Sequence, residues 1–209
     1  MKDKGIILFD IDRTIFDTSS LSKLIESEFR KIMKGASLEE IRNAKSEFVA
    51  SLSADREFDP ENLTDHLCKR FNFDDKDSLM NVYYDPKNKT WYRDSVFPEV
   101  YEVFESLKSK YRLGVYSEGT KRFQNYKFNS MGISDLLDRY LIFIFDHKTN
   151  PEALLQIPKE AIVVDDKESV CEYLSENGIK VIWLNKVDSR MSDKFKTIHS
   201  LSELPRMLL

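Results

Sequence analysis

The hydrophobic residues of this chain follow two patterns that alternate along its length. Residues such as Val100, Val103, Phe104 and Leu107 recur at intervals of three and four, which is typical of one face of a helix. Between such helices lie short apolar runs that predict strands, near residues 5–11, 112–117, 141–145, 161–165 and 179–184. Because strands that alternate with helices form a parallel sheet covered on both faces, we expect an α/β fold with a Rossmann-like parallel sheet.

One long segment interrupts this alternation. Between Phe16 and about Arg93 no strand pattern appears, whereas apolar residues at helical spacing form successive helical faces. We therefore predict an α/β core formed by residues 1–15 and 94–209, with a small all-helical domain of about four helices at residues 16–93. The chain leaves the first strand and returns to the same sheet, which favours an insertion; an independent interaction module is the alternative.

The composition is that of an ordinary globular protein. Of the 209 residues, 41% are hydrophobic and 33% are charged, which suits one sizeable core with a small second unit. No apolar run approaches the roughly 18 residues of a membrane span, and the first residues run straight into a strand without a secretory signal. The net charge of -4 is spread over interspersed acids and bases, with no basic stripe for nucleic acid. We expect a monomer that binds neither nucleic acid nor membrane.

The two cysteines, Cys68 and Cys171, are far apart in sequence and occupy apolar positions of predicted helices. We therefore expect buried free thiols rather than a disulfide or a metal site. This usage is typical of a reducing compartment, so a cytoplasmic location is expected.

The candidate chemistry begins with Asp10 and Asp12, which follow the first apolar run. In an extended strand the side chains at i and i+2 point the same way, so both carboxylates are expected to face one spot at the carboxyl end of the sheet. Open α/β sheets bind ligands at that edge. Asp75 and Asp77 have the same spacing, but they lie in a polar stretch that reads as a loop and a helix start.

Further polar residues follow at the ends of later predicted elements. They are Ser117, Glu118 and Gly119 after the second strand, Lys148 shortly before Pro151, and Asp165 and Asp166 after a third strand. In kind and order, these groups resemble the four motifs of the haloacid dehalogenase superfamily, most of whose members are Mg²⁺-dependent phosphohydrolases. The resemblance runs from about residue 6 to 184, apart from the helical insert. The segment from Gly119 through Gln124 to Lys127 is also similar to that of its small-molecule phosphatases.

The resemblance implies a mechanism for a small soluble phosphomonoester substrate. Asp10 is then the nucleophile, which forms an aspartyl-phosphate, and Asp12 is the general acid and later the base, which needs a raised pKa. Ser117, the amides of Glu118 and Gly119, and the side chain of Lys148 are expected to bind the phosphoryl oxygens. The helical insert corresponds to a cap that closes over the site.

The implied cofactor is Mg²⁺, a hard cation that takes few carboxylates and keeps waters. The resemblance gives it an oxygen of Asp10, the backbone carbonyl of Asp12, and a carboxylate of the fourth motif. Asp166 is favoured as that ligand, while Asp165 is expected to orient water or Lys148. Either residue is also suited to capping the helix that follows.

Two residues depart from the family pattern. Arg13 stands where many relatives have glycine, and Glu118 stands where close relatives have asparagine. Glu118 is expected either to turn away toward Arg122, one helical turn on, or to select a substrate with a donor or cationic group. Candidates for specificity, by chemistry and proximity, are Thr18, Lys23, Arg56, Trp91, Tyr92 and Arg93.

Several functions remain open at this point. A dehalogenase would use the same nucleophile on carbon and would not need the second acid, so Asp12 argues against it. A phosphomutase would pass the phosphoryl group to a sugar hydroxyl rather than to water. A catalytically silent relative, acting as a binding or regulatory module, is the non-enzymatic alternative.

Overall fold

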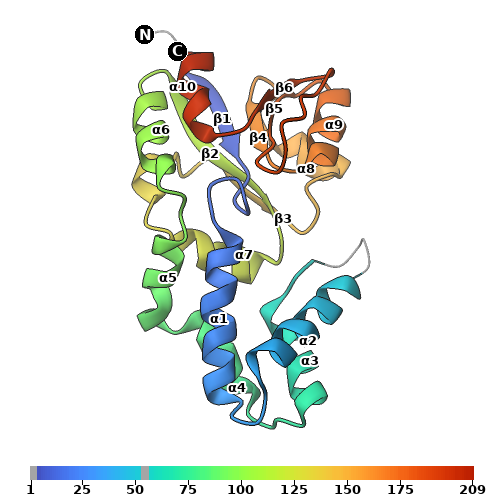
Figure 1. Cartoon of the computed structure of the whole chain (residues 1–209). Coiled ribbons are helices and arrows are strands. Elements are labelled where there is room, and N and C mark those ends of the chain that lie inside the picture. Colours follow the sequence, from blue (N-terminus) through green and yellow to red (C-terminus); the bar gives the residue numbers. More distant parts are fainter. Residues whose placement is uncertain (1–3, 53–56) are drawn as a thin grey trace.

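The computed structural model describes residues 4–52 and 57–209. Its centre is a single sheet of six parallel strands in the order β3-β2-β1-β4-β5-β6 (Figure 1). The strands are β1 Gly5–Phe9, β2 Tyr111–Glu118, β3 Ile142–Phe145, β4 Ile162–Asp165, β5 Lys180–Leu184 and β6 Lys196–Ile198. The α/β class is therefore confirmed. Only β6 was not predicted, because its three residues are too few to show a period.

Helices cover both faces of the sheet, as the alternation of β1 shows. Ile7 and Phe9 pack into one apolar cluster with α6, whereas Ile6 and Leu8 pack into a second cluster with α9. In Figure 1 helices α6 and α10 lie on one side of the sheet, with α8 and α9 on the other. These core helices are α6 Glu99–Leu107, α7 Lys121–Ser130, α8 Pro151–Gln156, α9 Glu168–Glu176 and α10 Leu204–Leu208, with short 3-10 turns η2 Ser134–Leu136 and η3 Leu201–Glu203. Among the described residues, no helix combines the length and apolarity needed to cross a membrane.

The long insert is helical in the part that the structure describes. Its elements are α1 Thr18–Ile32, α2 Leu38–Ala50, α3 Pro60–Phe71, α4 Lys76–Tyr84, η1 Pro86–Asn88 and α5 Lys89–Asp94. The four longer helices match the four predicted faces, and each begins with a side-chain cap, from Asp17, Ser37, Asp59 and Asp75 respectively. The short α5 was not predicted, because its six residues are too few to show helical spacing.

The insert shares its hydrophobic core with the sheet through α7. Tyr83 and Tyr92 of the insert contact Phe123 and Tyr126 of α7, with ring centroids 5.6 and 5.5 Å apart. The Tyr92 hydroxyl donates a hydrogen bond of 2.8 Å to the Tyr83 carbonyl, and the side chain is fully buried. Tyr92 is therefore a core residue, and its prediction as a specificity residue was wrong. The side of the insert formed by α4 and α5 therefore packs against α7 through aromatic side chains.

Candidate active site

The polar residues singled out by the sequence meet at the carboxyl ends of β1, β2 and β4. Asp10 follows β1 directly, Ser117 lies near the end of β2, and Asp165 is the last residue of β4. The Asp10 amide donates to the Val164 carbonyl at 2.9 Å, so Asp10 stays in register with β4. Parallel pairing of these strands places the three side chains at one edge of the sheet.

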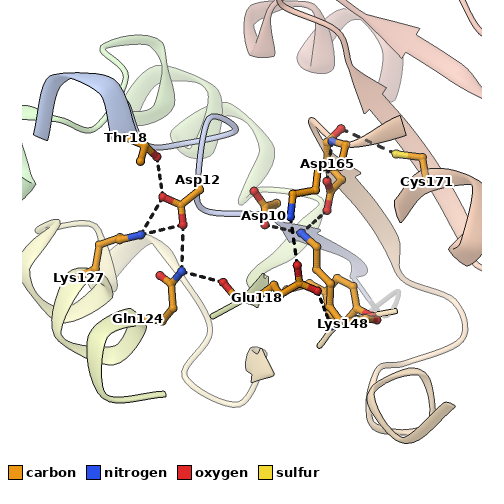
Figure 2. Close-up of polar contacts among 11 residues, drawn as sticks. Asp10, Asp12, Thr18, Glu118, Gln124, Lys127, Lys148, Asp165 and Cys171 are labelled. Atoms are coloured by element: carbon orange, nitrogen blue, oxygen red, sulfur yellow. Dashed lines mark hydrogen bonds and ion pairs between the residues drawn. The ribbon is translucent and has the colours of Figure 1, made fainter. Parts of the chain in front are cut away.

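The two carboxylates of the first motif do not face one spot, which corrects the expectation drawn from strand geometry. Strand β1 ends at Phe9, so the two-residue period does not extend to Asp12. The chain turns immediately afterwards, and Arg13 adopts a left-handed backbone with φ of 63°. Figure 2 shows Asp10 directed toward Lys148 and Asp12 directed away from it, toward Gln124 and Lys127.

The left-handed turn also explains the departure at Arg13. A side chain in this conformation costs about 1–2 kcal/mol, because the Cβ atom approaches the following carbonyl oxygen. Glycine avoids this cost. The backbone amide of Arg13 donates to the Phe16 carbonyl at 2.8 Å, which closes the turn and supports the conformation.

Asp10 lies in a buried group of charges. The Lys148 ammonium donates to Asp10 Oδ1 at 2.5 Å and to Asp165 Oδ2 at 2.6 Å, and none of the three residues is more than 4% exposed. Burial, followed by the charges of Asp165 and Asp166, raises the pKa of Asp10 to about 8, although Lys148 opposes the shift. Burial alone would lower the pKa of Lys148, but the Asp10 and Asp165 carboxylates raise it.

The same group has the chemistry of a hard-cation site. Carboxylate oxygens of Asp10, Asp165 and Asp166 all lie within 4.8 Å of one another. Burial and the Asp165 carboxylate raise the pKa of Asp166 to about 6, and Lys148 is the one ammonium that contacts these carboxylates among the described residues, so negative charge is in excess. Three carboxylates without nitrogen or sulfur ligands suit Mg²⁺. The Asp12 carboxylate does not belong to this group.

Asp165 and Asp166 differ in how their side chains are engaged. Asp165 accepts from Lys148 on one oxygen and from the Lys167 amide at 2.9 Å on the other. The N-cap position of α9 is occupied by Lys167, so neither aspartate is the helix cap. Asp165 therefore orients Lys148, and Asp166 has the more available carboxylate.

Asp12 lies in the opposite kind of surroundings. Lys127 donates to its two oxygens at 2.8 and 2.7 Å, Thr18 donates to Oδ1 at 2.6 Å, and Gln124 donates to Oδ2 at 3.0 Å. Burial would raise the pKa of Asp12, but the charge and hydrogen bonds of Lys127, with those of Thr18 and Gln124, lower it to about 2. The raised pKa required of a general acid is thus not found in this arrangement.

Lys127 and Gln124 were not assigned roles from the sequence. They lie one helical turn apart on α7 and are buried, at 2% and 4% exposed. The only signal was their place in the segment that resembles the small-molecule phosphatases. Nothing local to Lys127 indicated that its partner would be Asp12, which is 115 residues away.

The predicted phosphate-binding turn is partly as expected. The hydroxyls of Ser117 and Thr14 are buried and have no hydrogen-bond partner among the described residues, as expected of groups that await a ligand. The Gly119 amide, in contrast, donates to the Phe145 carbonyl at 2.9 Å, so its predicted role as a phosphate donor is not supported. Gly119 has φ of 138°, and a Cβ atom there would lie 2.7 Å from Gln124 Nε2, so only glycine fits.

Glu118 turns toward Lys148 and Lys167 and not toward Arg122. Its carboxylate accepts from the Lys148 amide at 2.9 Å and from the Lys167 ammonium at 3.1 Å. The guanidinium of Arg122 instead stacks 4.7 Å from the centre of the Tyr84 ring. Although burial opposes it, the hydrogen bond from Lys148 and the charge of Lys167 lower the pKa of Glu118, so it stays ionised.

A second cluster of polar side chains lies on the rim of the site. Glu57, Glu118 and His147 bring potential ligand atoms within 4.8 Å of one another. Burial and the neighbouring Glu118 raise the pKa of Glu57. Glu57 belongs to the segment between α2 and α3, so the insert reaches the core at this point.

The remaining specificity candidates are scattered. Thr18 reaches the site through its bond to Asp12, and Lys23 lines a groove between α1 and α2. Trp91 packs against the hydrophobic core, and Arg93 is exposed beside Asp94. Arg56 lies outside the described residues.

The chain resembles known proteins in sequence and in fold. The family model described as haloacid dehalogenase-like hydrolase matches residues 7–184. Enolase-phosphatase E1 of Shewanella halifaxensis is 26% identical over 125 residues, which cover 54% of this chain and 55% of that protein. The chain thus matches about half the length of this curated relative.

Solved structures with the same fold cover nearly the whole chain. A haloacid dehalogenase-like hydrolase from Burkholderia xenovorans LB400 has a TM-score of 0.72 at 15% identity, covering 98% of this chain and 97% of its own. The 2-haloacid dehalogenase from Pseudomonas syringae pv. Tomato DC3000 has a TM-score of 0.67 at 19% identity, covering 99% and 98%. The HAD-hydrolase YfnB from Bacillus subtilis, described as bound to magnesium, has a TM-score of 0.62 at 16% identity, covering 99% of each chain.

Proposed function

The chain belongs to the haloacid dehalogenase-like hydrolases, and from this premise we propose that it is a Mg²⁺-dependent phosphatase that hydrolyses a small phosphomonoester through an aspartyl-phosphate. The observation that carries the proposal is the dedicated environment of Asp12, held by Lys127, Gln124 and Thr18. A nucleophile alone would not need a second carboxylate maintained in this way. Acid–base catalysis on a phosphate ester does need a second carboxylate, held close to the nucleophile, to transfer the proton.

In this proposal a carboxylate oxygen of Asp10 attacks phosphorus, and the bond from phosphorus to the leaving-group oxygen breaks. Ser117 and Lys148 bind the phosphoryl oxygens, since the Ser117 hydroxyl has no other partner and Lys148 already contacts Asp10. Water then attacks the aspartyl-phosphate, which releases phosphate and restores Asp10.

Asp10, Asp165 and Asp166 are the side chains proposed to hold Mg²⁺. When bound, the ion supplies positive charge that offsets the repulsion among the carboxylates and the phosphate dianion. Asp10 needs such a cation to act as a nucleophile, because its pKa of about 8 otherwise keeps it largely protonated at neutral pH.

Asp12 is the proposed proton-transfer group, and its surroundings suit one half of that role. The four hydrogen bonds to its carboxylate stabilise the ionised form, which is the form that activates water. Protonation of the leaving group requires Asp12 to move away from Lys127. We therefore expect leaving groups that depart without a proton, such as phenolates, to react faster than alkoxides.

We also propose that residues 16–93 form a cap over the site. Asp10 and Lys148 are only 4% and 1% exposed, so a substrate reaches them only after part of the chain moves. Helices α4 and α5 rest on α7 through aromatic contacts. The α2 and α3 side, which reaches Glu118 through Glu57, is the part that we expect to open.

The test is hydrolysis of an aryl phosphate by the purified protein with Mg²⁺, after chelation, and in the variant Asp10→Asn. We expect phosphate release that needs the metal and disappears in the variant. Acid-quenched wild type should carry a phosphoryl group on Asp10. Halide release from a 2-haloacid, without phosphate release from any ester, would instead identify a dehalogenase, a class to which structural neighbours belong.

A further inference from the structure

A groove of about 600 Å³ runs between α1 and α2, which pack side by side (Figure 1). Its wall begins at Ser19, the residue after Thr18, whose hydroxyl donates a hydrogen bond to Asp12. From Ser19 to Glu26 the wall extends along α1 for about 10 Å, at about 1.5 Å per residue. The groove is therefore placed to receive the part of a substrate that extends beyond the phosphoryl group.

The walls of the groove are polar and carry an excess of positive charge. Charged lining residues are Lys23 and Glu26 from α1, and Arg42 and Lys45 from α2. Serine hydroxyls complete the polar lining, from Ser19, Ser22 and Ser46. Three cations thus accompany a single carboxylate, a combination that attracts anions.

Glu26 anchors two of these cations in the groove. Its side chain is only 9% exposed, and it accepts from Lys45 Nζ at 2.9 Å, Arg42 Nε at 3.1 Å and Ser22 Oγ at 2.6 Å. Burial opposes ionisation, but these hydrogen bonds lower the pKa of Glu26, so the carboxylate stays charged. The two cationic head groups are therefore fixed before a ligand arrives, which reduces the entropy lost on binding.

Donors remain for a ligand after these contacts are made. Arg42 contacts Glu26 only through Nε, so its two terminal nitrogens remain available, and its side chain is 50% exposed. Lys23 makes no ion pair with a carboxylate among the described residues. A carboxylate or phosphate group suits such a set, since guanidinium nitrogens match the geometry of two anionic oxygens.

The other charged part of the rim favours the same orientation. Glu57 and Glu118 lie together there, and the pKa of Glu57 is raised by burial and by the charge of Glu118. An anionic leaving group finds no free cation among the described residues at this point, because the Lys167 ammonium is paired with Glu118, whereas the groove attracts it.

We propose that the groove between α1 and α2 binds a second anionic group, a carboxylate or a phosphate, carried by the leaving group of the substrate. This inference rests on the proposed phosphatase function. It assigns Arg42 and Lys23 as residues that select substrates with two anionic groups over singly anionic phosphomonoesters.

The test compares two phosphonates, whose carbon–phosphorus bond a phosphatase does not cleave. One is 12-phosphonododecanoate, whose extended chain exceeds the roughly 12 Å of helix between Thr18 and Glu26. The other is its amide, in which an uncharged group replaces the terminal carboxylate. Calorimetry of the wild type with Mg²⁺ should show the carboxylate binding at least about tenfold more tightly than the amide, as expected for a charge-assisted contact. Equal affinities, or no binding of either ligand, would overturn the proposal.

Matched variants locate the effect. Arg42→Gln and Lys23→Gln should bring the two affinities close together, whereas Lys31→Gln on the same helix should preserve the difference. Lys31 is a suitable control because it is 66% exposed and pairs with Glu28, outside the groove lining. Because Lys23 is exposed, Lys23→Gln should fold normally. It can therefore test the proposal even if Arg42→Gln fails to fold. A preference that persists in both variants would contradict the assignment.

Two further measurements distinguish binding in the groove from binding at the phosphoryl site. Sulfate should compete with 12-phosphonododecanoate in the wild type, and Arg42→Gln should weaken that competition. Sulfate that binds through Arg42 without competing would identify an independent anion site and overturn the substrate role. Ser117→Ala should weaken both phosphonates equally and leave their ratio unchanged. If Ser117→Ala affects neither ligand while the ratio still depends on Arg42, the phosphatase proposal fails and the anion groove stands.

Discussion

Asp10 and Asp12 are separated by one residue, yet their carboxylates lie in opposite electrostatic surroundings (Figure 2). Asp10 shares one buried ammonium, that of Lys148, with Asp165, and Asp166 is also near. Asp12 is the carboxylate that pairs with the Lys127 ammonium among the described residues, and it also accepts from the neutral side chains of Thr18 and Gln124. Burial and neighbouring carboxylates raise the pKa of Asp10 to about 8, whereas Lys127 lowers that of Asp12 to about 2 despite burial.

The comparison shows that the ratio of cations to carboxylates, and not residue type, sets the behaviour of each aspartate. Around Asp10 the negative charge is in excess, so the pocket gains most from a further cation. Around Asp12 the charges balance, so the carboxylate is stabilised as an anion without help. Neighbouring acids whose environments push their pKa values apart are typical of divided acid–base roles.

The largest expected effect comes from removing the nucleophile. Asp10→Asn should lose at least about ten thousandfold in hydrolysis of every phosphomonoester, because the aspartyl-phosphate is not formed. Steady-state phosphate release measures the loss, and acid-quenched protein should carry no phosphoryl group. Retention of aryl phosphatase activity would show that Asp10 is not the nucleophile.

Asp12→Asn should have a smaller effect that depends on the leaving group. Removing proton transfer should cost about a hundredfold or more on alkyl phosphates, within the range of general acid–base catalysis. Aryl phosphates need little protonation and should lose less. Rates for a series of leaving groups give the comparison, and equal losses across the series would argue against the assigned role.

Replacing Lys127, the cation that contacts Asp12, should raise the pKa of Asp12 toward that of Asp10. In Lys127→Met only the hydrogen bonds from Thr18 and Gln124 still oppose burial, so the pKa of Asp12 should rise and Asp12 should be protonated more readily. The rate on alkyl relative to aryl phosphates should therefore increase by several fold, at about the scale of one pKa unit. Arg at the same position should restore the original ratio.

The control for Lys127→Met is Lys121→Met, which removes an exposed lysine from the first turn of the same helix. Its ratio of alkyl to aryl rates should equal that of the wild type. If both variants change the ratio equally, the effect belongs to the helix and not to the contact with Asp12.

The smallest effect concerns stability in the absence of metal. The pKa of Asp10 is about 8 in the folded state and 3.8 as its ordinary value, so between these pH values the folded protein holds a proton that the unfolded chain has released. Stability should therefore fall as pH rises through this window. Asp10→Asn removes this dependence and should be more stable than the wild type at about pH 8 by about 1 kcal/mol or more, since one pKa unit corresponds to about 1.4 kcal/mol.

Urea unfolding in excess chelator at about pH 5 and about pH 8 measures this difference. Asp12 should behave in the opposite sense, because its lowered pKa contributes stability that is lost only as pH falls from about 4 toward 2. Parallel stability curves for Asp10→Asn and wild type would mean that Asp10 is ionised without metal.

The sequence by itself determined the fold class, the strands β1 to β5 and the four longer helices of the insert. These follow from apolar periodicity, which each segment carries locally. It also placed Asp10, Ser117 and Asp165 at one edge, because the carboxyl ends of parallel strands meet there once the sheet is formed. The short elements β6 and α5 were not predicted, since a hydrophobic period needs more residues than they contain.

The tertiary structure alone decided the charge environment of each side chain. Lys127 meets Asp12 across 115 residues, and Lys148 meets Asp10 across 138. The turn at Arg13, which ends the strand period, sends Asp12 away from Asp10. A pKa depends on burial and on charges within a few ångströms, and these distances are fixed by packing between distant segments rather than by local sequence.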